Sequence, residues 1–249
     1  MRKGVSTSII KSNIDLLHKL PDADLYELGF FNAEDLDRIK SFINQKNTSF
    51  GIHCPFVYRF PRHPHLTSMD NAKRKKTMEI IEKCAILSKD LKAEYIVVHF
   101  PDSYQNENWL MLLDYIKSFL SHINHIIPVR IENVYFNKYF HSYRDYLRFF
   151  EDTEFTFCVD IGHLLMDAEY FRFNPLEFIK KTKNFISEFH IYYADIRSYK
   201  KCHHKPWKED ENFLRILNFI KSFDCDMVIE PTPYCNEGLD KLLIYWRNL

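Results

Sequence analysis

Apolar residues along the chain fall into two recurring patterns. Short runs rich in β-branched and aromatic residues, bounded by turn residues, predict strands. The clearest run is Glu-Tyr-Ile-Val-Val-His at residues 94–99. Runs of this kind predict strands over Gly4–Ile9, Ala23–Leu28, Ser49–His53, Glu94–His99, Pro128–Asn133, Phe155–Asp160, Phe185–Tyr192 and Asp226–Glu230.

Helical spacing fills the intervals between these runs. Apolar positions three and four residues apart predict helices over Asn13–Leu20, Asn32–Phe42, Met69–Leu87, Asn108–Ile123, Ser142–Phe150, Pro175–Thr182, Asn212–Phe223 and Leu239–Trp246. Strand followed by helix, about eight times over, is the signature of a (β/α)₈ TIM barrel of the α/β class. No linker or change of composition divides the chain, so we predict one domain over residues 1–249.

The predicted strands end in a distinctive set of residues. The run over residues 155–160 stops at Asp160, and Gly162 is expected to turn the chain before His163. Other strands end alike, which gives the set Glu27, His53, His99, Glu132, Asp160, His190 and Glu230. Because the carboxyl ends of barrel strands converge on one face, we expect these side chains to share one cup.

Such a cup calls for a cation. A single histidine or carboxylate at a strand end is usually a hydrogen-bonded core residue or the point where the chain meets water. Several carboxylates gathered together are different, because each raises the pKa of the others and each loses solvation. The set as a whole therefore predicts a divalent metal site.

Composition narrows the function further. The 249 residues are 46% hydrophobic and 27% charged, as expected for a globular protein with a full core. Lys plus Arg equals Asp plus Glu at 34 each, which argues mildly against a nucleic-acid partner. With only five glycines, the sequence contains neither a G-x-G-x-x-G pattern nor a P-loop, which excludes nucleotide cofactors bound in those ways.

The same reasoning gives expectations about location. The six cysteines form no Cys-x-x-Cys pair, and a chain of this size needs no disulfide for stability, so we expect a reducing, cytoplasmic setting. The segment after Met1-Arg2-Lys3 is too short and polar for a signal peptide, and no window has the ~20 apolar residues of a membrane helix. A soluble protein without a membrane partner is predicted, and its oligomeric state stays open.

The order of the motifs resembles a known superfamily. Glu132-Asn133, Asp160-Ile161-Gly162-His163, His190 with Asp195, and Ile229-Glu230 resemble the xylose isomerase-like TIM barrels, which include sugar-phosphate isomerases, epimerases and endonuclease IV. Resemblance to the ketose 3-epimerases implies one Mn²⁺ or similar ion held by Glu132, Asp160, His190 and Glu230. It also implies that Glu132 and Glu230 are the catalytic pair exchanging the substrate proton and that His163 binds substrate.

Resemblance to endonuclease IV implies a larger metal centre. Its three zinc ions would add His53, His99 and His163 as ligands, and Cys202-His203-His204 would replace an Asp-x-His pair, with His204 as a ligand. Cysteine stands at the aspartate position, so a third metal would depend on Cys202 as a zinc ligand. The two resemblances together imply between one and three Mn²⁺ or Zn²⁺ ions.

Three functions follow from these patterns. We expect an isomerase or epimerase acting on a sugar, a sugar phosphate or a polyol, with a multi-zinc phosphodiesterase second and a non-catalytic barrel module third. Arg197 and Trp207, which follow the seventh predicted strand, are expected to contact substrate. The segment Val57–Thr67, with Arg59, Arg62 and His63, is long enough to lie over a site.

Overall fold

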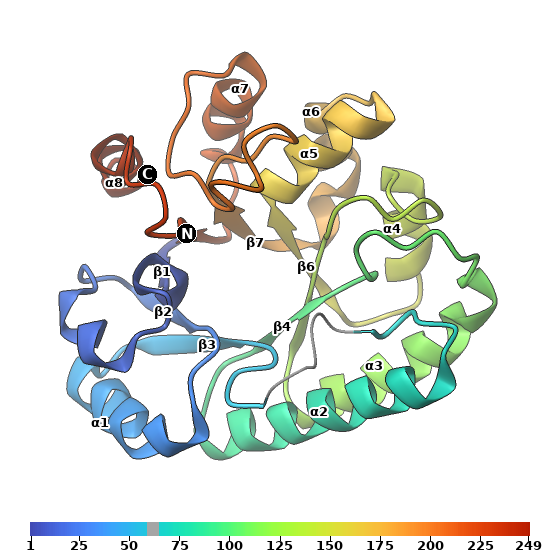
Figure 1. Ribbon diagram of the computed structural model, residues 1–249, viewed down its shortest axis with the longest axis horizontal. Helices are drawn as coiled ribbons and strands as arrows, with labels where there is room; N and C mark the ends of the chain where they lie inside the picture. The colour runs from blue at the N-terminus through green and yellow to red at the C-terminus, as the bar shows by residue number, and fades with distance from the viewer. Residues whose placement is uncertain (59–64) are drawn as a thin grey trace.

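The strands close into a barrel in their order along the chain. The computed structural model describes residues 1–58 and 65–249, and within these the eight strands are parallel, each paired with the next and β8 with β1. Figure 1 shows helices arranged around the strands. The strands are β1 (Arg2–Ser6), β2 (Leu25–Leu28), β3 (Ser49–His53), β4 (Ile96–His99), β5 (Val129–Glu132), β6 (Thr156–Asp160), β7 (Ile186–Ile191) and β8 (Asp226–Ile229).

Helices connect most of the strands. They are α1 (Leu36–Lys46), α2 (Asn71–Asp90), α3 (Leu113–Ile126), α4 (Tyr143–Phe150), α5 (Ile161–Phe171), α6 (Pro175–Thr182), α7 (Glu211–Ile220) and α8 (Leu239–Arg247). Short 3-10 helices occur at η1 (Thr7–Ile10), η2 (Ile14–Lys19), η3 (Ala33–Asp35), η4 (Leu110–Leu112) and η5 (Lys183–Phe185). The predicted (β/α)₈ barrel is confirmed.

The predicted elements match the structure unevenly. β3 and α6 have the predicted bounds, but the α-helix expected over Asn13–Leu20 is the 3-10 helix η2. Asn13 caps this segment, and Leu20, which precedes a proline, is extended, so only six residues lie between the two. Such a short interval favours a 3-10 helix over an isolated α-helix. Of the predicted loop, Arg59, Arg62 and His63 lie outside the described residues.

The largest difference lies after β6. Gly162 was expected to form a turn, but α5 begins at Ile161, the residue after the strand ends. The Asp160 side chain is the N-cap and accepts the backbone N–H of His163 at 2.7 Å. Glycine at 162 serves close packing, because a Cβ there would lie 2.1 Å from the Tyr192 ring.

Aromatic side chains fill much of the space between barrel and helices. Tyr146 of α4 stacks on Phe157 of β6 with ring centroids 4.9 Å apart, and Phe149 stacks on Phe100 at 4.3 Å. Each of these four side chains is at most 2% exposed. Burying large rings stabilises the fold through removal of apolar surface from water, with an added contribution from ring geometry. This packing uses several of the 22 phenylalanines of the chain.

The inside of the barrel holds a buried ion-pair network below the predicted cup. Arg130 of β5 donates to Glu188 at 3.0 Å and to Asp226 at 2.8 Å, and its guanidinium lies 3.4 Å from the centre of the Tyr95 ring. Burial raises the pKa of Glu188 to about 7, with the neighbouring Glu27 adding to the effect, while Arg130 opposes it. Arg130 therefore compensates two acidic groups that have little access to water.

Two cysteines form a disulfide. Cys202, in the segment between β7 and α7, is bonded to Cys235, between β8 and α8, with Cα atoms 5.8 Å apart. The expectation that the chain uses no disulfide is therefore wrong. The two positions are 33 residues apart, so local sequence gives no sign of the pairing.

None of the described helices combines the length and apolar character needed to span a bilayer.

Replacing Arg130 tests the ion-pair network. We expect Arg130→Met to lower the free energy of unfolding by about 3 to 5 kcal/mol, because it leaves Glu188 buried without its closest cation, whereas Asp226 keeps its pair with Arg2. Urea denaturation measures this loss. The control is Arg38→Met, which removes an exposed pair with Asp15 and should cost at most about 1 kcal/mol. Equal losses in the two variants would contradict the proposed role of Arg130.

Candidate metal centre

Four side chains meet where the strands end. Glu132 ends β5, Asp160 ends β6, His190 lies within β7, and Glu230 directly follows β8. His190 Nδ1 is 3.5 Å from Glu132 Oε1, 4.0 Å from Asp160 Oδ2 and 3.3 Å from Glu230 Oε2. One ligand atom from each of the four residues lies within 4.8 Å of the others, and all four residues are buried. We call this set the four-residue group.

Three atoms of the group have no hydrogen-bond partner. Glu132 Oε1, Asp160 Oδ2 and His190 Nδ1 are buried and unsatisfied. Leaving such atoms unpaired is costly, particularly for charged groups. Carboxylate oxygens and an imidazole nitrogen are ligand atoms that suit Mn²⁺ or Zn²⁺, so this donor set fits a divalent cation.

Other hydrogen bonds fix the remaining oxygens. Ser6 donates its hydroxyl to Glu230 Oε1 at 3.2 Å, and the backbone N–H of His163 donates to Asp160 Oδ1. Asn133 holds the Asp160 backbone on both sides, donating to its C=O at 3.0 Å and accepting its N–H at 2.8 Å. The protein therefore occupies one oxygen of each of these two carboxylates and leaves the other facing the group. Ser6 and Asn133 act through these contacts, and sequence reasoning assigned them no role.

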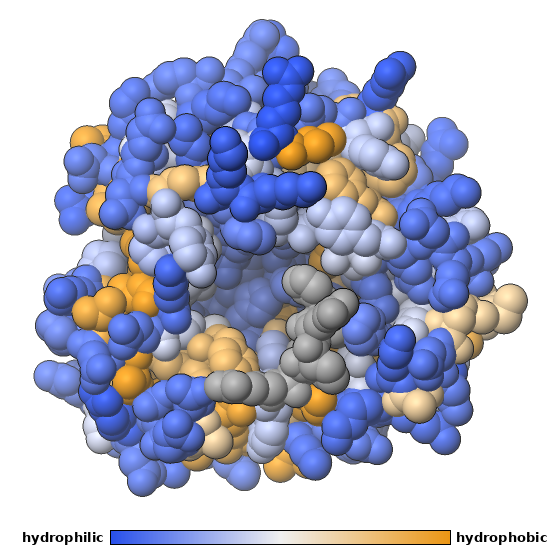
Figure 2. Space-filling model, in the orientation of Figure 1, coloured by the Kyte–Doolittle hydropathy of each residue, from blue (hydrophilic) through white to orange (hydrophobic). Residues whose placement is uncertain are grey.

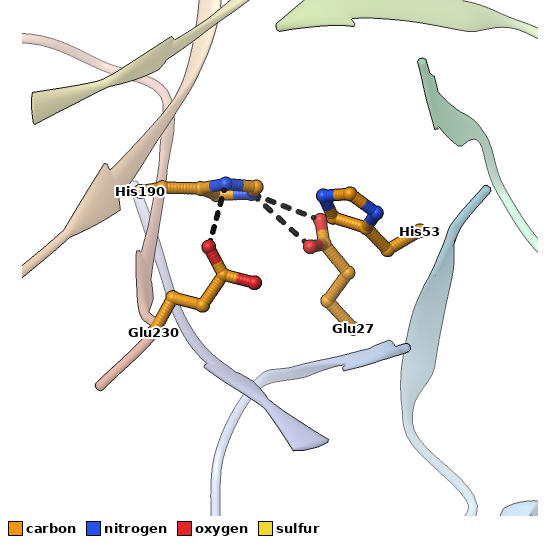
Figure 3. A group of neighbouring side chains, drawn as sticks. All are labelled: Glu27, His53, His190 and Glu230. Carbon is orange, nitrogen blue, oxygen red and sulfur yellow. Dashed lines mark hydrogen bonds and ion pairs between the residues drawn. The ribbon is translucent and has the colours of Figure 1, made fainter. Parts of the chain in front are cut away.

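Glu27 holds His190 from the opposite side. His190 Nε2 donates to Glu27 Oε2 at 3.2 Å and lies 3.1 Å from the other carboxylate oxygen, Oε1. Figure 3 shows these contacts on one edge of the imidazole ring and the contact with Glu230 on the other. This arrangement selects the tautomer in which Nδ1 is free to bind a cation. The strand-end pattern included Glu27, but only the fold shows which residue it contacts.

A second set of ligands surrounds the same glutamate. His53 Nε2 and His99 Nε2 lie 2.8 Å and 3.0 Å from Glu132 Oε2. His53, His99 and Glu132 together form a further group of potential ligands whose atoms lie within 4.8 Å of one another. Glu132 thus presents one oxygen to the four-residue group and the other to these histidines, a geometry able to bridge two cations.

The electrostatic surroundings favour positive charge here. Burial opposes a charged His53, yet Glu132 outweighs it and raises the pKa of His53 to about 10. Burial likewise opposes ionisation of Glu132, but His99, His53 and His190 hold its pKa well below the usual value. The pKa of Asp160 is raised, first by burial and then by the charge of Glu132. An added cation would relieve this repulsion between acidic groups.

His163 and His204 are also brought to the cup. His163 Nδ1 donates to the backbone oxygen of Asn133 at 2.9 Å, and His204 Nδ1 donates to that of Glu230 at 2.9 Å. Burial lowers the pKa of both rings, that of His163 to about 3. Both imidazoles are therefore neutral near pH 7, with Nε2 left as an acceptor or ligand.

The cup is a cavity of about 330 Å³. Figure 2 shows a hydrophilic hollow at the middle of the visible face. The residues that line the cavity include His53, His99, Glu132, Tyr135, His163, Tyr199, His203, His204, Glu230 and Tyr234. Histidine and tyrosine thus make up most of the residues that line it.

Two predicted substrate contacts are not at this cavity. Among the described residues that line it, neither Trp207 nor Arg197 occurs. The Trp207 ring packs 5.6 Å from Phe213 and donates its N–H to Glu209, and Arg197 is exposed. Both interpretations relied on nearness in sequence to β7, and the intervening segment carries these side chains elsewhere.

Cys202 is also unsuited to its suggested role. Its sulfur is bonded to Cys235, so it supplies no thiolate for a third zinc ion. The disulfide instead joins the two segments that carry His203, His204 and Tyr234 into the cup wall.

Solved structures share this architecture. A D-tagatose 3-epimerase-like protein aligns with a TM-score of 0.72 and 21% identity over 100% of this chain and 98% of its own. L-ribulose 3-epimerase aligns at 0.70 and 17% identity over 100% and 88%. Endonuclease IV from Thermus thermophilus aligns at 0.67 and 13% identity over 100% and 98%. At these identities the likeness establishes the fold alone.

Sequence comparison identifies the family. Comparison with curated proteins finds no match. The family model described as xylose isomerase-like TIM barrel matches residues 16–238, which is most of the chain. The chain therefore belongs to the family of xylose isomerase-like TIM barrels.

Proposed function

We propose that the protein is a divalent-metal-dependent isomerase or epimerase that moves a proton on a sugar or polyol. The observation that carries the proposal is the four-residue group, in which two glutamates approach one side of His190. Glu132 Oε1 and Glu230 Oε2 lie 3.5 Å and 3.3 Å from the same atom, His190 Nδ1. The epimerase structures with the same fold support this choice, as does the histidine-rich and tyrosine-rich cavity.

The two glutamates are equipped for proton exchange. A bound divalent cation, held by Glu132, Asp160, His190 and Glu230, would polarise the substrate carbonyl and the neighbouring hydroxyl. Burial opposes ionisation of Glu230, but His190 outweighs it and lowers its pKa to about 2, so both glutamates are ionised. One accepts the proton from the carbon beside the carbonyl, and the other takes a proton from solvent and delivers it to the opposite face of that carbon, so that one proton leaves the carbon and one is added.

Neutral histidines suit a polyhydroxylated substrate. His163 and His204 each donate Nδ1–H to a backbone carbonyl, so their Nε2 atoms are acceptors for substrate hydroxyl groups. Neither ring carries a charge that would select for a phosphate near pH 7. A small-molecule sugar is therefore the proposed substrate, and nucleic acid remains disfavoured.

A phosphodiesterase with two or three zinc ions is the second candidate. The set of His53, His99 and Glu132 favours it, because phosphate-ester hydrolysis often uses paired metals. The disulfide at Cys202 counts against a third zinc ion.

A cytoplasmic location stays a prediction, and the disulfide argues against a strongly reducing compartment.

Deuterium exchange tests the proposed reaction. With Mn²⁺ added, we expect the protein to incorporate solvent deuterium at the carbon beside the carbonyl of a ketose such as D-fructose or D-tagatose. Glu132→Gln and Glu230→Gln should each lower kcat/KM by about 10²-fold to 10⁴-fold, because each removes one proton-transfer group. Proton NMR measures the exchange. Hydrolysis of bis(p-nitrophenyl) phosphate without exchange into any ketose would instead support the phosphodiesterase. The absence of both activities would support the non-catalytic module.

Metal counting separates the two enzyme classes. We expect Asp160→Ala to abolish tight binding, because it removes a ligand from the four-residue group. His53→Ala and His99→Ala should leave one metal ion per chain in the single-metal isomerase. Elemental analysis of dialysed protein measures the ratio. Two or three ions in the wild type, reduced by the histidine changes, would count against the single-metal isomerase.

Glu27→Gln tests the positioning of His190. We expect metal affinity to fall about 10-fold to 100-fold, because a neutral amide supports the imidazole less strongly than a carboxylate does. Calorimetric titration with Mn²⁺ or Zn²⁺ measures the change. Tyr95→Phe is the control, since it removes a hydroxyl 3.4 Å from Glu27 without touching the bond to His190. Unchanged affinity in Glu27→Gln would show that Glu27 does not position the ligand.

A further inference from the structure

A second cavity adjoins the cup. It has a volume of about 280 Å³ and is formed largely by the segment after β4, including Asp102, Ser103 and Tyr104. Ser103 lines both this side cavity and the cup. A molecule bound at the four-residue group therefore has a neighbouring space into which a substituent can extend.

An aromatic platform leads from the cup to this space. The Tyr135 ring, which lines the cup, lies 4.8 Å from His163 and 5.3 Å from Tyr104, measured between ring centroids. Tyr104 is 58% exposed, so a large part of its ring is available to a ligand. Apolar ring faces beside hydroxyl groups are suited to stacking against a sugar ring.

The backbone holds this platform in an uncommon conformation. Tyr104 has φ of 56° and Phe136, whose ring lies 5.3 Å from it, has φ of 60°. Bulky residues rarely adopt these left-handed angles because the Cβ atom clashes with the backbone. Conformations of this kind cluster at ligand sites, where the surrounding structure maintains them. The contact between two such aromatic residues indicates that the fold keeps these rings in fixed positions.

The polar groups of the side cavity suit hydroxyls. The Asp102 side chain is 10% exposed, and its Oδ1 accepts the backbone N–H of Thr67 at 3.1 Å. Its Oδ2 lies 3.9 Å from His65 Nδ1, beyond hydrogen-bond distance, so within the described residues this imidazole does not bond it. Glu107 adds a second carboxylate to the lining. Burial raises the pKa of Asp102 to about 7, and its carboxyl oxygens accept hydroxyl donors in either protonation state, which suits an uncharged sugar.

We propose that the side cavity is a binding subsite for a second sugar ring, so that the substrate is a disaccharide or another glycoside rather than a free monosaccharide. The keto sugar would lie at the four-residue group, and the second ring would rest against Tyr104 with its hydroxyls directed to Asp102 and Glu107. This inference rests on the proposed function and specifies the substrate class for the same site.

Calorimetric titration of the Mn²⁺-loaded protein tests the subsite. The probes are D-fructose and two disaccharides in which glucose is joined to fructose, turanose and isomaltulose. We expect at least one disaccharide to bind about tenfold more tightly than D-fructose. Tyr104→Gly should abolish this gain and leave D-fructose binding unchanged. Glycine tolerates the left-handed backbone at this position, so the variant is expected to fold.

A second tyrosine variant provides the matched control. Tyr115→Ala replaces a tyrosine of similar exposure on α3, which lines neither cavity, and should change no affinity. Binding of D-fructose without a gain for either disaccharide, or an equal loss for both sugars in Tyr104→Gly, would overturn the subsite while leaving the proposed function standing. If none of the three sugars binds, the proposed function would be overturned as well.

Discussion

The site depends on keeping one buried histidine among four carboxylates. His190 is fully buried and contacts Glu27 through Nε2, while Glu132, Asp160 and Glu230 surround Nδ1. Burial opposes charge on His190, and nearby acidic groups together with Cys158 outweigh it and raise its pKa. A cluster of acids this dense is stable only where cationic groups are interleaved with it. Without a bound metal ion, His190 fills that place at the carboxyl end of the strands; with one bound, the metal ion would fill it and His190 would be a neutral ligand.

Arg130 fills the equivalent place deeper in the barrel. Tyr95 links the two levels, because its hydroxyl lies 3.0 Å from Glu188 and 3.4 Å from Glu27. A continuous path of polar contacts therefore runs through the barrel interior from the predicted metal centre to Arg130. The outer core between strands and helices is, by contrast, packed with aromatic rings. The polar groups of the barrel interior and the aromatic packing thus lie in different layers of the same fold.

The sequence predicts the barrel well, because the spacing of apolar residues and the turn residues that end each element are local signals. β3 and α6 could be bounded from a histidine followed by a turn and from an Asn-Pro cap. The set of strand-end residues followed from topology, since the carboxyl ends of barrel strands lie on one face. Contacts that depend on side-chain direction could not be predicted in this way: the pairing of Glu27 with His190, the disulfide at Cys202, and the packing of Trp207 against Phe213. Each joins residues far apart in sequence or depends on the path of a loop.

The junction of β6 and α5 has a consequence for how the cup can open. Asp160 is the last residue of the strand and the cap of the helix, so no linker separates them. The disulfide similarly joins the segments after β7 and β8. These parts of the rim cannot shift separately without breaking a cap or a covalent bond. Among the described segments, any separate movement of the rim that admits a substrate therefore lies outside these two junctions.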